Sequence, residues 1–184
     1  MVYGRYKKKY LKYYWLENYL FDDVNKNFHN RGHLIPEEFF AIVIWKSNRA
    51  KTNVRGGIIK SKRTIRAITS EIFQAKTPEQ KFNVFLSPKV PNIGIPIASA
   101  ILTVCYPNDF TIADYRACAS LKNFGEEVGG NPTINISTYF EYLDKCKKLA
   151  HKYKVSLRDF DRVLWAKDFY EGKNGLKHLV EGLE

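Results

Sequence analysis

The sequence predicts an all-α fold, and three observations lead to that prediction. Apolar residues recur at three- and four-residue steps along most of the chain, as they do on the buried face of a helix. Several segments begin with a proline where the first helical turn would lie. No segment alternates with period two for long enough to predict a strand. With 184 residues, 45% of them hydrophobic, the chain can bury a core as one domain or as two small lobes sharing a core.

The first part of the chain contains two predicted helices. Residues 8–28 carry tyrosines, leucines and a tryptophan at mixed three- and four-residue steps, which is typical of an amphipathic helix. A second helix should run over 36–48. Pro36 suits its first position, and the acidic Glu37 and Glu38 favour a helix N-terminus.

A break is expected next, at Gly56-Gly57, with room for a short extended piece over 54–59. A helix over 60–75 should follow, with isoleucines along one face. Thr77-Pro78 then combines an N-cap with a proline at the first helical position, so it predicts the start of a short helix. That helix should end near Ser87-Pro88.

The second half of the chain begins with its most apolar segment. Residues 97–106 are apolar nearly all round, which predicts a buried central helix. Asp114 should open the next helix as an N-cap. Three further helices are predicted: from Ser137 or Thr138 to about 153, over 156–169 with Ser156 in a capping-box pattern, and over 175–182.

A tight turn, Pro91-Asn92-Ile93-Gly94, precedes the apolar helix. It would present backbone N–H groups at a helix N-terminus, which suits a phosphate. Glycine permits close approach of the backbone to a ligand, and asparagine adopts left-handed backbone angles more readily than most residues. The same turn could also be an ordinary connection between two core helices.

The distance along the chain from this turn to Asp114 strengthens the functional interpretation of the turn. Asp114 lies 20 residues after Gly94, behind a small-and-aliphatic helix. This combination resembles the helix-hairpin-helix superfamily of DNA glycosylases, the endonuclease III-like proteins, over roughly residues 36–120. The family usually has Leu-Pro-Gly-Val-Gly and Val-Asp-Thr, where this chain has Val-Pro-Asn-Ile-Gly and Ala-Asp-Tyr. No cysteine follows Cys146, so the resemblance is to a divergent branch without the iron–sulfur cluster.

The resemblance implies a two-lobed helical fold and the excision of a base from DNA. Residues 22–113 would form a helical barrel lobe with the hairpin, and residues 1–21 and 114–184 a second lobe. A flipped nucleotide would enter a pocket, where Asp114 would stabilise positive charge on the sugar as the base leaves. Because residues 95–99 contain no lysine, we expect a monofunctional enzyme without β-lyase action.

The resemblance also implies roles for other residues. The hairpin would bind phosphate, Trp45 or Asn48 would fill the gap left by the flipped base, and Lys46 and Arg49 would bind phosphate. Trp45 could equally be a core residue. Apart from the resemblance, Asp161 and Arg162 are expected to pair and lock helices together, and they are not placed in the site. The expected DNA contacts are Lys89, Pro91, Asn92, Ile93, Gly94, Lys46, Asn48 and Arg49, with Trp45, Tyr115 and Arg116 as pocket or wedge residues.

Charge points to the same kind of partner. The net charge is +11, and no acidic residue occurs between Glu38 and Glu71 or between Glu79 and Asp109. This favours a polyanion. We expect a monomer that binds double-stranded DNA and no membrane, in the cytoplasm at the nucleoid. The three cysteines suggest a reduced compartment. No cofactor is expected, apart from a monovalent cation that the hairpin could hold.

Two alternatives stay open. The chain could be a non-enzymatic helix-hairpin-helix module that binds DNA, or a nuclease or defence-system subunit that uses the fold only for docking. Burial of Asp114 separates the first alternative from an enzyme. A functional carboxylate should line a cleft, whereas a simple cap would lie on the surface or be fully packed. The base that would be excised is not predicted by the sequence.

Overall fold

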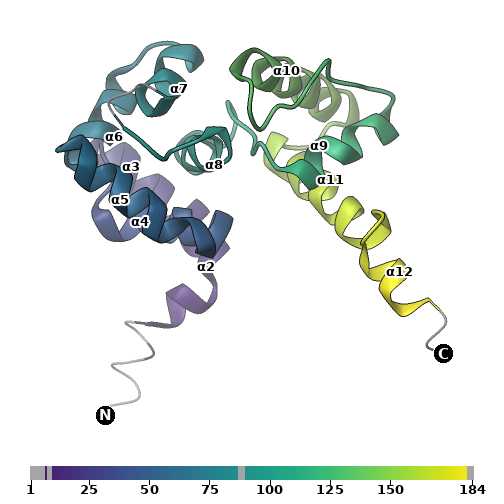
Figure 1. The fold of residues 1–184 in the computed structure, drawn as a ribbon, viewed down its shortest axis with the longest axis horizontal. Coiled ribbons are helices and arrows are strands. Elements are labelled where there is room, and N and C mark those ends of the chain that lie inside the picture. The colour runs from purple at the N-terminus through teal and green to yellow at the C-terminus, as the bar shows by residue number, and fades with distance from the viewer. Residues whose placement is uncertain (1–6, 8–9, 87–89, 182–184) are drawn as a thin grey trace.

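A computed structural model describes residues 7, 10–86 and 90–181, and every regular element in that part of the chain is helical. The all-α prediction is confirmed. Figure 1 shows helices α2 to α8 gathered on one side and α9 to α12 on the other. The connection between the two groups runs through residues 106–114. The assignment of the chain to two lobes with a boundary at residue 113 stays a prediction.

The N-terminal segment follows a helical path with a change of register. Residues 10–14 are helical, Trp15 lies in a turn, and α2 (Leu16–Asn18) leads into a π-helix, η1 (Tyr19–Val24). Helix α3 (Asn25–Arg31) follows and ends at Gly32, whose φ of 73° is left-handed. The predicted helix over 8–28 is therefore interrupted, and its residues 8 and 9 lie outside the described residues.

The next helices of the first group begin where local capping fixes them. Helix α4 (Pro36–Ser47) starts at Pro36, and α7 (Pro78–Leu86) starts at Pro78, both as predicted. The third predicted helix begins later than expected, because the Thr64 hydroxyl accepts a hydrogen bond from the Ala67 N–H at 3.1 Å and caps α6 (Ile65–Gln74).

The expected break at Gly56-Gly57 is wrong. Both glycines lie inside α5 (Lys51–Ser61), which follows a short 3-10 turn, η2 (Asn48–Ala50), and 54–59 is not extended. The reason is packing against the turn before α8. A Cβ built on Gly57 would lie 1.9 Å from the carbonyl oxygen of Pro91, whereas one on Gly56 would meet nothing within 4 Å. Gly57 therefore allows a close backbone contact and does not end a helix.

Helix α8 (Ile95–Cys105) is the central helix. All of its residues except Pro96 are buried, so the prediction of a buried central helix is confirmed. Its two polar side chains are satisfied locally: the Thr103 hydroxyl donates to the Ser99 carbonyl at 2.8 Å, and the Ser99 hydroxyl donates to the Pro96 carbonyl at 3.1 Å.

The second group begins with α9 (Tyr115–Leu121), capped by Asp114 as predicted, and the 3-10 turn η3 (Lys122–Phe124). Asn135, and not Ser137 or Thr138, caps the long helix α10 (Ile136–Tyr153). Ser156 caps α11 (Leu157–Glu171) as predicted, and its hydroxyl accepts from the Asp159 N–H at 3.0 Å. The last helix is α12 (Leu176–Val180).

The two glycines of α5 give a matched test of the contact with Pro91. Gly57→Ala should lower the free energy of unfolding by about 1–3 kcal/mol, because the new methyl group must displace the turn. Gly56→Ala should raise it by about 0.4–1 kcal/mol, because an open helical site gains helix propensity. Urea unfolding of both variants measures the difference. A Gly57→Ala protein as stable as Gly56→Ala would contradict the close contact.

Candidate functional site

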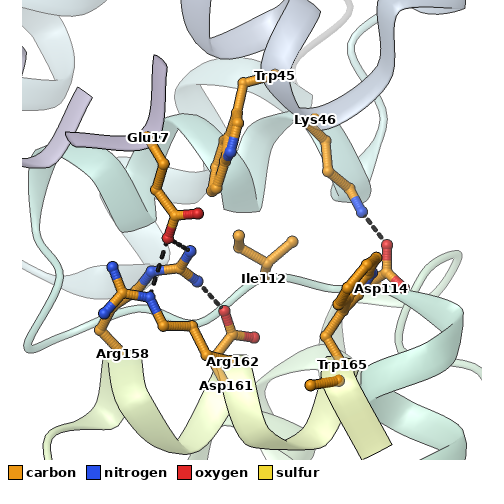
Figure 2. A pocket seen from close by; sticks show the side chains of 10 residues that line it. Glu17, Trp45, Lys46, Ile112, Asp114, Arg158, Asp161, Arg162 and Trp165 are labelled. Carbon is orange, nitrogen blue, oxygen red and sulfur yellow. Dashed lines mark hydrogen bonds and ion pairs between the residues drawn. The ribbon is translucent and has the colours of Figure 1, made fainter. Parts of the chain in front are cut away.

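A cavity of about 400 Å³ lies where α2, α4, the 110–114 segment and α11 meet. Figure 2 shows side chains from both groups of helices facing it. Its size falls within the range of about 300–1,000 Å³ that is usual for small-molecule sites. The lining residues are Glu17, Trp45, Lys46, Ile112, Asp114, Arg158, Asp161, Arg162, Trp165 and Ala166.

Asp114 has two roles at once. As the N-cap of α9, one carboxylate oxygen accepts the Arg116 N–H at 2.9 Å. The other oxygen pairs with the ammonium of Lys46, which is at the end of α4. The Asp114 side chain is 17% exposed and that of Lys46 is 12% exposed, and both line the cavity. Asp114 is therefore neither on the open surface nor fully packed.

The segment before Asp114 is held by side chains from three helices. The Tyr139 hydroxyl of α10 donates to the Thr111 carbonyl at 2.9 Å. The Ala113 N–H donates to the Ser99 hydroxyl of α8 at 2.9 Å. The Thr111 hydroxyl donates to the Asp161 carboxylate of α11 at 3.0 Å. Since all of these bonds are buried, the backbone that carries Asp114 has a fixed path.

Arg158 connects the opposite wall of the cavity. Its guanidinium donates to Glu17 of α2 at 2.6 Å and pairs with Asp161 one turn along α11. It also lies over the rings of Phe21 and Trp45, at 4.6 and 5.3 Å from their centroids. Arg158 thus contacts four side chains from both groups of helices.

The pKa values of the two carboxylates paired with Arg158 are shifted in opposite directions. Burial raises the pKa of Asp161 above its usual value, although Arg158 and the Thr111 hydroxyl oppose that rise. Burial would also raise the pKa of Glu17, but hydrogen bonds and charge from Arg158 and Arg162 lower it overall. Glu17 is therefore ionised in this wall of the cavity, in contact with two guanidinium groups.

Trp45 packs against the core and also faces the cavity, and its role in filling the gap left by a flipped base stays a prediction. It is partly buried, packs edge-to-face on Phe21 with ring centroids 5.7 Å apart, and also lines the cavity. Lys46 lines it too, in contact with Asp114 where a phosphate contact was expected. Asn48 and Arg49 lie in η2 and are not among the lining residues; Asn48 accepts from Lys51 at 2.6 Å.

Tyr115 and Arg116 adjoin the cavity without lining it. Tyr115 is the first residue of α9 and is 66% exposed. The Arg116 guanidinium donates to Asp168 of α11 at 3.0 Å. Both residues therefore lie on the outer surface where α9 packs on α11.

The turn before α8 has the backbone that its sequence predicts. Asn92 has a left-handed φ of 65°, and its side-chain amide donates to the Asn53 carbonyl of α5 at 3.1 Å. Within the described residues, the backbone N–H groups of Gly94 and Ile95 have no acceptor. Ile93 is buried, and Lys89 lies outside the described residues. The helix-hairpin-helix assignment itself stays a prediction.

Sequence reasoning missed most of one wall of the cavity. The expected pair of Asp161 with Arg162 is wrong: Asp161 pairs with Arg158, and Arg162 pairs with Asp159 and Glu17. Adjacent residues on a helix point in different directions, whereas residues three or four apart share a face. The spacing of 158, 161, 162 and 165 was the available signal for a polar face with a tryptophan.

The cysteines, the possible metal ligands and the apolar helices are other features of functional interest. Cys105, Cys118 and Cys146 are free thiols, two of them buried, and burial raises the pKa of Cys118 to about 12. In the part of the chain that the structure describes, no group of three or more His, Cys, Asp or Glu side chains could hold a metal ion. Across those same residues, no helix is long and apolar enough to cross a membrane.

Comparisons with protein-family models, with curated proteins and with solved structures find no match to this chain.

Arg158 and Arg162 give a matched test of the cavity wall. Arg158→Met should lower the free energy of unfolding by about 3–5 kcal/mol, because it leaves the buried Asp161 without its partner. Arg162→Met should cost less than about 1 kcal/mol, because that side chain is half-exposed. Chemical denaturation at pH 7 measures both. Equal losses would contradict the role of Arg158.

The loss of stability caused by Arg158→Met should depend on pH. Without Arg158, the folded-state pKa of Asp161 rises further above its unfolded value, so the folded state binds the extra proton. The loss of stability should therefore be largest at neutral pH and shrink as the pH falls through that raised pKa. Unfolding curves between pH 7 and pH 4 check this. A loss that stays constant over the range would show that the Asp161 charge is not its cause.

Proposed function

We propose that this protein is a DNA glycosylase that removes a damaged or modified base by hydrolysing the N-glycosidic bond. The observation that carries the proposal is the position of Asp114. Its carboxylate caps α9 and at the same time lines a cavity that two tryptophans also line. A carboxylate held beside a cavity that could receive a base suits a reaction with positive charge on the sugar.

The proposed chemistry uses the cavity to hold a flipped nucleotide. Trp45 and Trp165 line this cavity and would contact the base. Water adds to C1′ of the sugar, the electron pair of the N-glycosidic bond leaves with the base, and the base takes up a proton. Asp114 stabilises the positive charge that develops on the sugar and orients the water.

We propose that water, and not an amine, attacks the sugar. In the free protein the Lys46 ammonium is paired with Asp114, and while protonated it has no electron pair with which to attack. Transfer of that proton to Asp114 would make Lys46 a nucleophile, so the monofunctional activity stays a prediction that borohydride trapping tests. In the free protein Lys46 offsets the charge of Asp114, and the phosphate beside a flipped nucleotide is a second anion that the same ammonium could contact.

Binding of double-stranded DNA by a monomer is part of the proposal, as is a location at the nucleoid. The net charge of +11 and the acid-free stretches support a polyanionic partner. The Gly94 and Ile95 N–H groups would donate to a backbone phosphate. The alternative is a DNA-binding module without activity. The partly buried Asp114 beside a cavity favours the enzyme, since a simple cap would be fully exposed or fully packed.

An excision screen tests the reaction. Duplex oligonucleotides that carry single alkylated, deaminated, oxidised or hypermodified bases are incubated with the protein, and abasic sites are counted after alkaline cleavage. Asp114→Asn should reduce excision at least about 100-fold, because the charge that stabilises the sugar is lost. Equal activity of both proteins would refute the role of Asp114. Binding to every duplex without excision would favour the module.

Borohydride trapping tests the water step. The wild-type protein should form no covalent adduct with its substrate DNA under borohydride, because no amine attacks C1′. Lys46→Arg serves as the control for adducts made elsewhere on the chain. A trapped adduct that the wild type forms and Lys46→Arg does not would overturn the assignment of water as the nucleophile.

A further inference from the structure

A row of planar side chains adjoins the cavity through Trp165. The rings of Trp165 and Phe169 are parallel, with centroids 5.1 Å apart and an angle of 10° between their planes. The Arg116 guanidinium lies 5.9 Å from the Phe169 ring and 5.2 Å from the Tyr115 ring. We call these four residues of α9 and α11 the stacked row.

The stacked row is both exposed and held in place. Trp165 is 44% exposed, Phe169 45% and Tyr115 66%, although large aromatic side chains gain most from burial. The 3.0 Å ion pair between Arg116 and Asp168 fixes the guanidinium, and α9 packs along α11 beneath it. The row is therefore a partly exposed surface whose side chains are held by contacts with one another and with Asp168.

The position of the stacked row and the charges around it indicate which kind of ligand would bind to it. Trp165 lines the cavity together with Asp114. Its ring stacks on Phe169, which is not a lining residue, so the row joins the place where a flipped base would sit to the surface beside it. The acidic residues nearest the row in α11 are both ion-paired, Asp168 with Arg116 and Glu171 with Lys167, so they would not repel a polyanion. Aromatic and guanidinium faces stack on any nucleobase without regard to sequence.

We infer that the stacked row binds unpaired nucleobases next to the target nucleotide, so that the protein holds a short unstacked stretch of DNA and not one flipped base alone. This inference rests on the proposed function for the identity of the target. It adds a class of ligand, single-stranded DNA, that the hairpin and Asp114 do not require.

Two oligonucleotides with the same backbone test the inference. Fluorescence anisotropy is measured with a fluorescein-labelled 12-mer of thymidine and with a 12-mer of tetrahydrofuran abasic units, which has equal charge and no bases. The wild type should bind the thymidine strand about tenfold more tightly, as stacking of one base would give. The ratio should persist as salt is raised, although both affinities fall.

Variants separate the row from the cavity. Phe169→Leu lies outside the cavity lining and should reduce the preference for bases severalfold, and Trp165→Leu with Phe169→Leu should abolish it. Tyr153→Leu, at a similarly exposed tyrosine of α10, should leave the preference unchanged. Circular dichroism melts establish that each variant is folded.

Three results would overturn the inference: equal wild-type affinity for both strands, a Phe169→Leu protein that matches Tyr153→Leu, or a row that mediates self-association in sedimentation and gives no preference for bases. The excision screen fails or succeeds independently. A protein that excises no base but prefers the thymidine strand through Phe169 keeps the stacked row and loses the proposed reaction.

Discussion

The arrangement of the candidate site depends on one partly buried cation. Arg158 is paired with Asp161 on its own helix and with Glu17 from the opposite group of helices, and the rings of Phe21 and Trp45 cover it. A guanidinium can satisfy several partners because its donors form a planar fork. The wall of the cavity exists because these partners converge on the same group.

That convergence extends to Asp114 through a short chain of contacts. The Asp161 carboxylate accepts a hydrogen bond from the Thr111 hydroxyl, and Thr111 belongs to the segment that ends at Asp114. Lys46 then joins Asp114 to the helix that carries Trp45. The cavity is therefore bounded on both sides by charged pairs that span the two groups of helices, and its shape is tied to their relative position.

Local signals in the sequence were enough to predict much of the fold, whereas contacts between residues far apart in the sequence could not be predicted. Pro36, Pro78, Asp114 and Ser156 mark helix starts because capping depends on neighbours in the chain. The helical Gly57 could not be predicted, since its reason is a turn 34 residues away. Asp114 was found by its spacing, whereas Arg158 needed knowledge of Glu17, 141 residues earlier.

The separation of 141 residues between Glu17 and Arg158 affects the order in which parts of the protein fold during synthesis. A ribosome releases α2 to α8 long before α11, and N-terminal units generally fold first. The first group could then collapse around α8 while Glu17 and Trp45 still lack their guanidinium partner. The cavity would be the last part of the molecule to form, so a chain interrupted before residue 157 would hold Asp114 but no enclosed space for it to face.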